Sequence, residues 1–191
     1  MKDLRALVFD WETTGIPLHP ETKIELQPRA IEFGGVIIER DGTVVRDLSF
    51  IIDPEQEIEP VITKITGLTN ADLRGKPKFA AVLPALREAF GMVDLMIAHN
   101  LPFDQFILEL ELQRLRINDF PWPRYGLCTV QAYQEQWGKR PKLTQLYEEV
   151  IGQKLAQTHR ATDDCLALAQ IVVKEQLLEL FYECNRYAGA A

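Results

Sequence analysis

Two carboxylates follow an apolar run near the start of the chain, in the stretch LVFDWETTGI. Because side chains alternate between the faces of a strand, Asp10 and Glu12 would project from one face and Trp11 from the other. Carboxylates held that close repel each other and raise one another's pKa unless a cation neutralises them, and a divalent metal ion is the simplest such cation. A strand that has become a polar turn is the other interpretation, since Thr13 and Thr14 are followed by Gly15. These ten residues do not decide between a metal site and a turn.

A third carboxylate, Asp104, falls in the first turn of a predicted helix, shortly after the apolar stretch DLMIA. The helix dipole stabilises an acid there by roughly a few tenths of a kcal/mol, which is a sufficient structural reason for it. That reason leaves unexplained the flanking AHN and PF residues, which bring further polar and apolar groups to the same strand end.

A fourth carboxylate, Asp164, lies near the start of the last predicted helix, in THRATDDCLALAQIVV. Helical spacing places Asp164 on the face of the apolar residues Leu168 and Ile171, whereas its neighbour Asp163 lies on a face with Gln170. We therefore expect Asp164 to point inward. A buried carboxylate is costly unless it is paired or bound to a metal ion.

A histidine, His159, precedes Asp164 by five residues, and we expect it in the loop that leads into this helix, leaning over the helix end. An exposed loop histidine without a role is the alternative for His159, and it is the expectation for His19 and His99. Oxygen ligands select Mg²⁺ or Mn²⁺ over zinc. Two such ions about 3.5–4 Å apart can activate a water and stabilise the leaving oxygen of a phosphodiester. A histidine is a natural general base for that water.

The elements that must position these residues are predicted to form an α/β fold. Two β-rich runs meet at Asp41-Gly42, a strong hairpin signal, and with the first strand they indicate an antiparallel start of three strands. Later strands at DLMIA and YGLCTV alternate with helices. A helix is predicted over KFAAVLPALREAFG, in which Pro84 must lie early or cause a kink, and one long helix is predicted from about Ala161 to Glu183.

Length and composition fit a single domain, residues 1–191 with a core of about 5–183. Hydrophobic residues make up 47% and charged residues 26% of the chain. The three cysteines have no paired spacing, and neither a signal peptide nor a membrane span is visible, so we expect a cytoplasmic protein. The net charge of −7 argues against broad nucleic-acid binding but not against action at an end. A basic cluster in WGKRPKL, Lys139, Arg140 and Lys142, is interpreted as a solvated loop, with phosphate contact as the minor alternative.

Four ordered stretches, FDWETTG, ITGLT, HNLPFD and HRATDD, resemble the motifs of the DEDD exonuclease superfamily in its histidine-containing DEDDh branch, which includes DnaQ-like proofreading subunits. The resemblance runs from about Leu7 to Ala169. It implies a ribonuclease H-like fold with a mixed five-stranded sheet, its first three strands antiparallel and flanked by helices. It also implies two divalent cations, Mg²⁺ or Mn²⁺, and 3′→5′ hydrolysis of nucleic acid 3′ ends that releases nucleoside 5′-monophosphates.

The resemblance further implies a role for each matched residue. Asp10, Glu12, Asp104 and Asp164 would hold the metal ions, and His159 would be the base. The residues that would bind the terminal nucleotide are Thr13, Thr14, Ile65, Leu68, Asn100 and Phe103.

Three departures from the family pattern qualify this assignment. Trp11 stands where a smaller residue is usual, and we expect it to pack in the core. The loop from Ile16 to Arg29 is long and could reshape the entrance for substrate. The chain stops at Ala191 without the tail of polymerase-associated relatives, which favours a stand-alone nuclease.

The substrate and partners stay open at the level of the sequence. DNA with single-stranded or frayed ends is favoured, with RNA 3′ ends as the alternative and a non-catalytic docking module in a replication assembly as a third hypothesis. A homodimer or association with a polymerase is not resolved.

Overall fold

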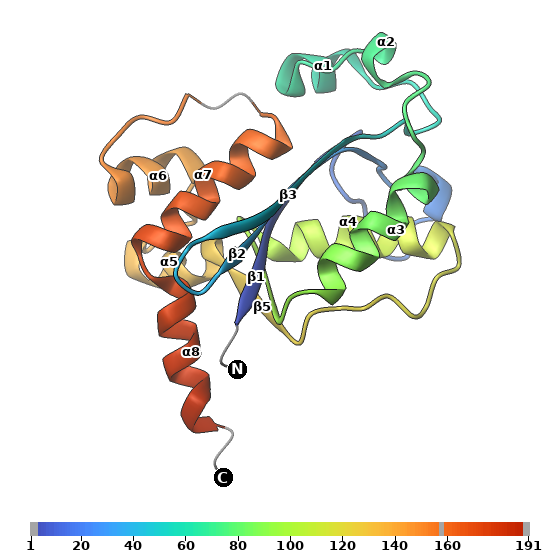
Figure 1. Ribbon diagram of the computed structural model, residues 1–191. Helices are drawn as coiled ribbons and strands as arrows, with labels where there is room; N and C mark the ends of the chain where they lie inside the picture. Colours follow the sequence, from blue (N-terminus) through green and yellow to red (C-terminus); the bar gives the residue numbers. More distant parts are fainter. Residues whose placement is uncertain (1–3, 157–158, 189–191) are drawn as a thin grey trace.

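A computed structural model describes residues 4–156 and 159–188, with side chains described as far as Cys184. Figure 1 shows a central sheet with helices on both sides. The strands are β1 (Arg5–Thr13), β2 (Ala30–Glu39), β3 (Val44–Ile51), β4 (Leu95–Ala98) and β5 (Tyr125–Cys128). Their order across the sheet is β3-β2-β1-β4-β5. The predicted mixed five-stranded sheet of a ribonuclease H-like fold is therefore confirmed.

Strand pairing follows the prediction for the first half of the chain. The pairs β1–β2 and β2–β3 are antiparallel, while β4 pairs with β1, and β5 with β4, in parallel. The hairpin between β2 and β3 turns at Gly42, whose φ of 87° is in the left-handed region that glycine adopts without strain. Parallel strands need a crossover between them, and helices supply it here.

Helices cover both faces of the sheet. They are α1 (Pro60–Thr66), α2 (Asn70–Leu73), α3 (Phe79–Gly91), α4 (Leu101–Arg114), α5 (Thr129–Trp137), α6 (Leu143–Ile151), α7 (Ala161–Lys174) and α8 (Leu177–Ala188), with a short 3-10 helix, η1, at Ile24–Leu26. In Figure 1, α3 and α4 lie on one side of the sheet and α5 to α8 on the other.

The alternation of side chains along β1 separates two hydrophobic cores. Leu7, Phe9 and Trp11 belong to the core that contains residues of α3 and α4. Ala6 and Val8 belong to the core that contains residues of α6 and α7. The same parity directs Asp10 and Glu12 toward the α7 side of the sheet.

The last helix and the helix that contains Pro84 differ in how they follow the predictions. The predicted final helix is wrong as one element, because α7 ends at Lys174 and α8 begins at Leu177. Gln176 between them has a φ of 52°, which breaks the helical backbone. Pro84 lies inside α3, where it removes a backbone donor, yet the helix continues to Gly91.

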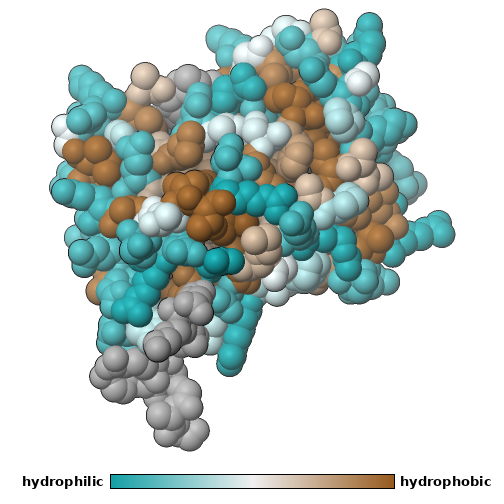
Figure 2. All heavy atoms as spheres, in the orientation of Figure 1, coloured by the Kyte–Doolittle hydropathy of each residue, from teal (hydrophilic) through white to brown (hydrophobic). Residues whose placement is uncertain are grey.

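Several large apolar side chains are exposed on the surface, among them Ile16 and Leu26 in the loop before β2. Figure 2 shows apolar and hydrophilic side chains interspersed over one face of the molecule. Val44 and Val45, on the edge strand β3, are 55% and 42% exposed. Among the described residues, no helix has the length and apolar character needed to cross a bilayer.

Candidate active site

Strand β1 places two carboxylates beyond the end of its neighbour β4. The pairing of β1 with β4 ends at Val8, whereas the pairing with β2 continues to Thr13. Asp10 and Glu12 are thus held by a paired strand, and the polar-turn interpretation of this stretch is wrong. One edge of β1 is left free at these residues, which makes room for other groups beside the carboxylates.

The third carboxylate enters at the start of α4, directly after β4. Asp104 is only 1% exposed, and its Oδ1 accepts a hydrogen bond of 3.2 Å from the backbone N–H of Trp11. Its other oxygen, Oδ2, has no hydrogen-bond partner among the described residues. A buried charged oxygen without a partner is costly, so this atom indicates a group that the protein itself does not supply.

The start of α7 packs directly against β2, opposite Asp10. A Cβ atom on Gly34, which pairs with Asp10, would come within 2.3 Å of the Ala161 backbone. Only glycine allows this close approach. The approach fixes the first turn of α7, and with it Asp164, beside the carboxylates of β1.

The structure brings His159 to the same place. His159 lies in the loop before α7, is exposed and has a φ of 50°. Ligand atoms of Glu12, His159 and Asp164 all lie within 4.8 Å of one another. Asp164 is buried and Asp163 exposed, as helical spacing predicted.

The carboxylates strongly perturb one another. Burial, followed by repulsion from Asp104, Glu12 and Asp164, raises the pKa of Asp10 well above its usual range. Burial and then repulsion from Asp164 raise the pKa of Glu12 to about 8. Burial also raises the pKa of Asp104. Such a set of like charges is typical of a functional site, because its cost is offset only when a cation or protons neutralise it.

One ion pair beside the site, between a buried glutamate and a half-exposed arginine, was not predicted from the sequence. Glu32 of β2 is fully buried opposite Glu12, and Arg160 donates to both of its carboxylate oxygens at 2.8–3.1 Å. The backbone N–H of Ala161 also donates to Glu32, at 3.3 Å. The pair therefore ties the residue after His159 to the sheet. A glutamate inside the apolar run AIEFGG was the available signal.

A cleft of about 620 Å³ connects these residues. The five residues predicted to carry the chemistry all line it, and so do the predicted nucleotide-binding residues Thr13, Asn100 and Phe103. A phenylalanine and an amide beside the carboxylates are suitable contacts for a base and its polar edge.

Three predicted nucleotide-binding residues are placed differently. Leu68 is 5% exposed and packs in a small core with Ile31 and Leu73. Ile65 is 46% exposed at the end of α1, and the Oγ1 of Thr14 accepts a hydrogen bond from the backbone N–H of Arg29. None of these three is among the residues that line the cleft.

Trp11 packs in the core, as expected from its place on the other face of β1. It is 3% exposed, and its ring centroid lies 4.6 Å from that of Phe33 and 6.1 Å from that of Phe79. Its side chain therefore supports β1 from behind the carboxylates.

His99 was predicted as an exposed loop histidine, and this prediction is wrong. Its Nδ1 lies 3.0 Å from Thr129 Oγ1 and its Nε2 lies 3.2 Å from the carbonyl oxygen of Pro141. Because that carbonyl can only accept, Nε2 donates and Nδ1 accepts from the hydroxyl. Burial is the main reason why the pKa of His99 is lowered, with repulsion from Arg140 adding to it. The contacts depend on residues 30 and 42 positions away, which sequence spacing does not reveal.

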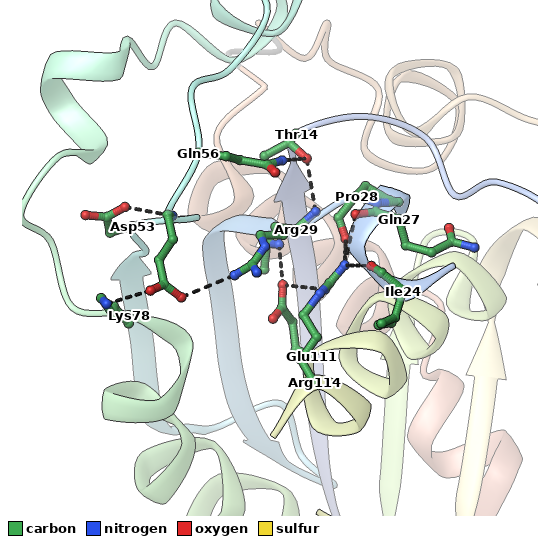
Figure 3. Close-up of polar contacts among 12 residues, drawn as sticks. Thr14, Ile24, Gln27, Pro28, Arg29, Asp53, Gln56, Lys78, Glu111 and Arg114 are labelled. Atoms are coloured by element: carbon green, nitrogen blue, oxygen red, sulfur yellow. Dashed lines mark hydrogen bonds and ion pairs between the residues drawn. The ribbon is translucent and has the colours of Figure 1, made fainter. Parts of the chain in front are cut away.

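The long loop before β2 is held by a separate polar network, shown in Figure 3. Arg114 of α4 donates through Nη2 to the carbonyl oxygens of Ile24, Gln27 and Pro28, at 2.9–3.1 Å. Glu111 lies 3.1 Å from Arg114 Nη1 and accepts a hydrogen bond from the backbone N–H of Ala30. The loop is thereby fixed at its base.

The donor set fits divalent metal ions. Four carboxylates converge from β1, α4 and α7, with a histidine from the loop before α7, and Asp104 Oδ2, which has no hydrogen-bond partner among the described residues, is an acceptor that a cation would satisfy. Together, these observations explain how like charges are tolerated in one cleft.

Comparison with known proteins identifies the family. The RNase_T family model, described as an exonuclease, matches residues 7–172. The DNA polymerase III subunit epsilon of Aquifex aeolicus is 31% identical over 170 residues, which cover 88% of this chain and 78% of that protein. The PolC-type DNA polymerase III of Clostridium perfringens is 30% identical over 170 residues, 89% of this chain but only 11% of that protein. The chain thus spans about a tenth of the length of that large relative.

A solved structure shares the fold. The nuclease domain of 3′hExo, a DEDDh family member bound to rAMP, superposes with a TM-score of 0.68 at 17% identity. The match covers 89% of this chain and 90% of that one.

Proposed function

The chain belongs to the exonuclease family that the RNase_T model describes, and from this premise we propose that it is a 3′→5′ exonuclease that uses two divalent metal ions, Mg²⁺ or Mn²⁺. It removes one nucleotide at a time from nucleic acid 3′ ends and releases nucleoside 5′-monophosphates. The observation that carries the proposal is the convergence of Asp10, Glu12, Asp104 and Asp164 with His159 in one cleft. A docking module would have no need for this arrangement of costly buried charges.

We assign the four carboxylates to metal binding. When bound there, the two ions would polarise the terminal phosphate and lower the barrier to attack by water. The chain contributes the position of these ligands: β1 and the Gly34 contact hold Glu12 and Asp164 together, and the Trp11 N–H orients Asp104.

His159 is assigned as the general base. Water attacks the phosphorus of the last phosphodiester, and the bond to the 3′ oxygen of the preceding nucleotide breaks as the new O–P bond forms. His159 accepts the proton of that water, and the leaving 3′ oxygen takes up a proton from solvent. Phe103 and Asn100 are assigned to the terminal base and sugar, because they line the cleft beside Asp104.

DNA is the favoured substrate. The similarity to polymerase III proteins supports it, and an association with a polymerase is consistent with the same relatives. An RNA 3′ end is the second candidate, because the structural neighbour is a nuclease bound to rAMP. A 2′-hydroxyl is what distinguishes the two polymers, and a direct rate comparison decides between them.

The test uses 5′-labelled single-stranded DNA and RNA of one sequence, with Mg²⁺, Mn²⁺ or a chelator. We expect a metal-dependent ladder that shortens from the 3′ end, with the DNA degraded faster. Asp164→Asn should abolish the ladder, and the matched neighbour Asp163→Asn should keep it, because Asp163 points out of the cleft. A ladder of unchanged rate from Asp164→Asn would refute the assignment.

A further inference from the structure

We propose that Arg140 and Lys142 form a second phosphate site in the cleft, which binds an internucleotide phosphate of the substrate strand other than the one that is cleaved. The inference rests on the proposed nuclease function and adds a strand-binding subsite to it. The sequence alone favoured a solvated loop for the basic cluster, and the structure now favours the alternative, contact with phosphate.

The first observation is the placement of the two cations. Arg140, Pro141 and Lys142 lie between α5 and α6 and line the same cleft as the carboxylates. Pro141 is buried, while Arg140 and Lys142 on either side of it are exposed. The loop therefore presents two positive charges to the cleft, and the buried Pro141 between them packs the loop against the rest of the protein.

The second observation is that this loop is anchored rather than merely solvated. His99 follows β4 and donates through Nε2 to the Pro141 carbonyl, while its Nδ1 accepts from the buried Thr129. Leu143, the first residue of α6, is 7% exposed in the core. The backbone that carries the two cations is thus anchored to the end of β4, which leads directly into Asn100 and α4.

The third observation is the contrast with Arg160, the other arginine near the cleft. Arg160 is paired with Glu32 through three hydrogen bonds. In the part of the chain that the structure describes, the ion pairs include neither Arg140 nor Lys142. In a chain of net charge −7, two cations that have no ion pair with any described residue, in an otherwise acidic cleft, have an anion as their natural ligand.

A nucleic acid strand is the anion that this cleft would meet. The carboxylates and their metal ions are assigned to the phosphate that is cleaved, so a cation pair on another element fits a different phosphate of the same strand. Such contacts give affinity without sequence preference and make binding depend on salt. His99 acts here as a positioning residue, through the loop that it holds.

The experiment measures binding and turnover of a 5′-fluorescein-labelled oligothymidylate by the full chain. The test variant is Arg140→Gln/Lys142→Gln, and the matched control is Lys139→Gln, which removes a neighbouring charge outside the cleft lining. Binding is followed by fluorescence anisotropy in chelator at several salt concentrations, and cleavage in Mg²⁺ gives KM and kcat separately.

We expect the test variant to raise KM about ten-fold and to lower the slope of log affinity against log salt by about 0.7, since one phosphate contact on a single strand contributes about that much. Lys139→Gln should stay within about two-fold of the wild type. The charge-preserving exchange Arg140→Lys/Lys142→Arg should restore the salt slope, which a merely misfolded loop would not do. His99→Gln should raise KM in the same direction by a smaller factor.

A second substrate separates this inference from the proposed function. The p-nitrophenyl ester of thymidine 5′-monophosphate has no internucleotide phosphate, so the preference of the enzyme for oligonucleotide over this ester should fall about ten-fold in the test variant. An unchanged salt slope and KM in a variant that still cleaves would overturn the phosphate site and leave the nuclease intact. Absence of cleavage by the wild type, with a salt slope still sensitive to the variant, would refute the nuclease and support the phosphate site.

Discussion

Helix α4 carries two buried carboxylates, seven residues apart, whose surroundings differ in one respect. Asp104 and Glu111 are 1% and 3% exposed, and each accepts a hydrogen bond from the backbone N–H of a strand, Trp11 or Ala30. Glu111 also has a cation, Arg114, at 3.1 Å, in the network of Figure 3. Asp104 lies among further carboxylates instead, and its Oδ2 has no partner in the described part of the chain. Glu111, which helps to hold the loop before β2, thus has a cation as its partner. Asp104, which we assign to metal binding, has none among the described residues.

The largest effect should come from removing the unpaired acid. Asp104→Asn should lower kcat by about a thousand-fold or more, because groups that only support metal ligands already cost 10–100-fold. Its melting temperature without metal should not fall, because the substitution removes a repelling charge. Cleavage rates and thermal melts of the same preparation check both statements. Normal turnover by Asp104→Asn would show that Asp104 is not needed for catalysis and does not differ from Glu111 in this respect.

The paired acid should behave in the opposite way. Glu111→Gln leaves Arg114 largely buried without its partner, so we expect a loss of about 3 kcal/mol in the free energy of unfolding. The melting temperature should fall by about 6–12 °C. Cleavage at 25 °C should persist, and a thousand-fold loss of activity in this variant, still folded, would mean that Glu111 also belongs to the site.

Metal ions and protons should compete to neutralise the carboxylate cluster in the cleft. The pKa of Glu12 is about 8 in the folded state, and those of Asp10 and Asp104 are raised as well, so this cluster binds more protons in the folded chain than in the unfolded one. Stability of the metal-free protein should therefore decline as pH rises from about 4 toward 8. Metal at about a hundred times its Kd should restore about 2.7 kcal/mol per ion, or about 5–10 °C, at pH 8. Thermal melts with chelator or Mn²⁺ measure this, and a metal-free Tm that rises over that range would contradict it.

A third buried acid, Glu32, lies beside the site, opposite Glu12, and like Glu111 it has an arginine as its partner, Arg160. The double variant Glu32→Gln/Arg160→Gln removes both charges together, which costs little stability in many buried pairs. We expect kcat to fall about ten-fold, because the residue after His159 loses its anchor on β2, while KM changes less than two-fold. Unchanged kcat would show that the pair serves folding alone.

The sequence was sufficient where local periodicity decides the structure. Strand alternation correctly predicted that Asp10 and Glu12 lie on the face opposite Trp11. Helical spacing correctly predicted that Asp164 is buried, and Asp41-Gly42 correctly predicted the hairpin. These features depend on neighbours in the chain.

The features that were missed depend on contacts between distant residues. The pair of Arg160 and Glu32 joins positions 128 apart, and the role of His99 depends on where Pro141 comes to lie. The helix break at Gln176 could not be predicted from a glycine or proline at that position. Leu68 was expected to contact the substrate, but a small core buries it. Periodicity does not encode such tertiary contacts.

Direct titration tests most simply whether the clustered carboxylates Asp10, Glu12, Asp104 and Asp164 hold divalent metal ions. Free Mn²⁺ is counted by electron paramagnetic resonance as the ion is added to wild-type protein, Asp104→Asn and Glu111→Gln at pH 8. We expect two saturable ions per chain for the wild type and for Glu111→Gln, and weaker or fewer ions for Asp104→Asn. The absence of saturable binding in the wild type, or equal binding in all three proteins, would contradict the account.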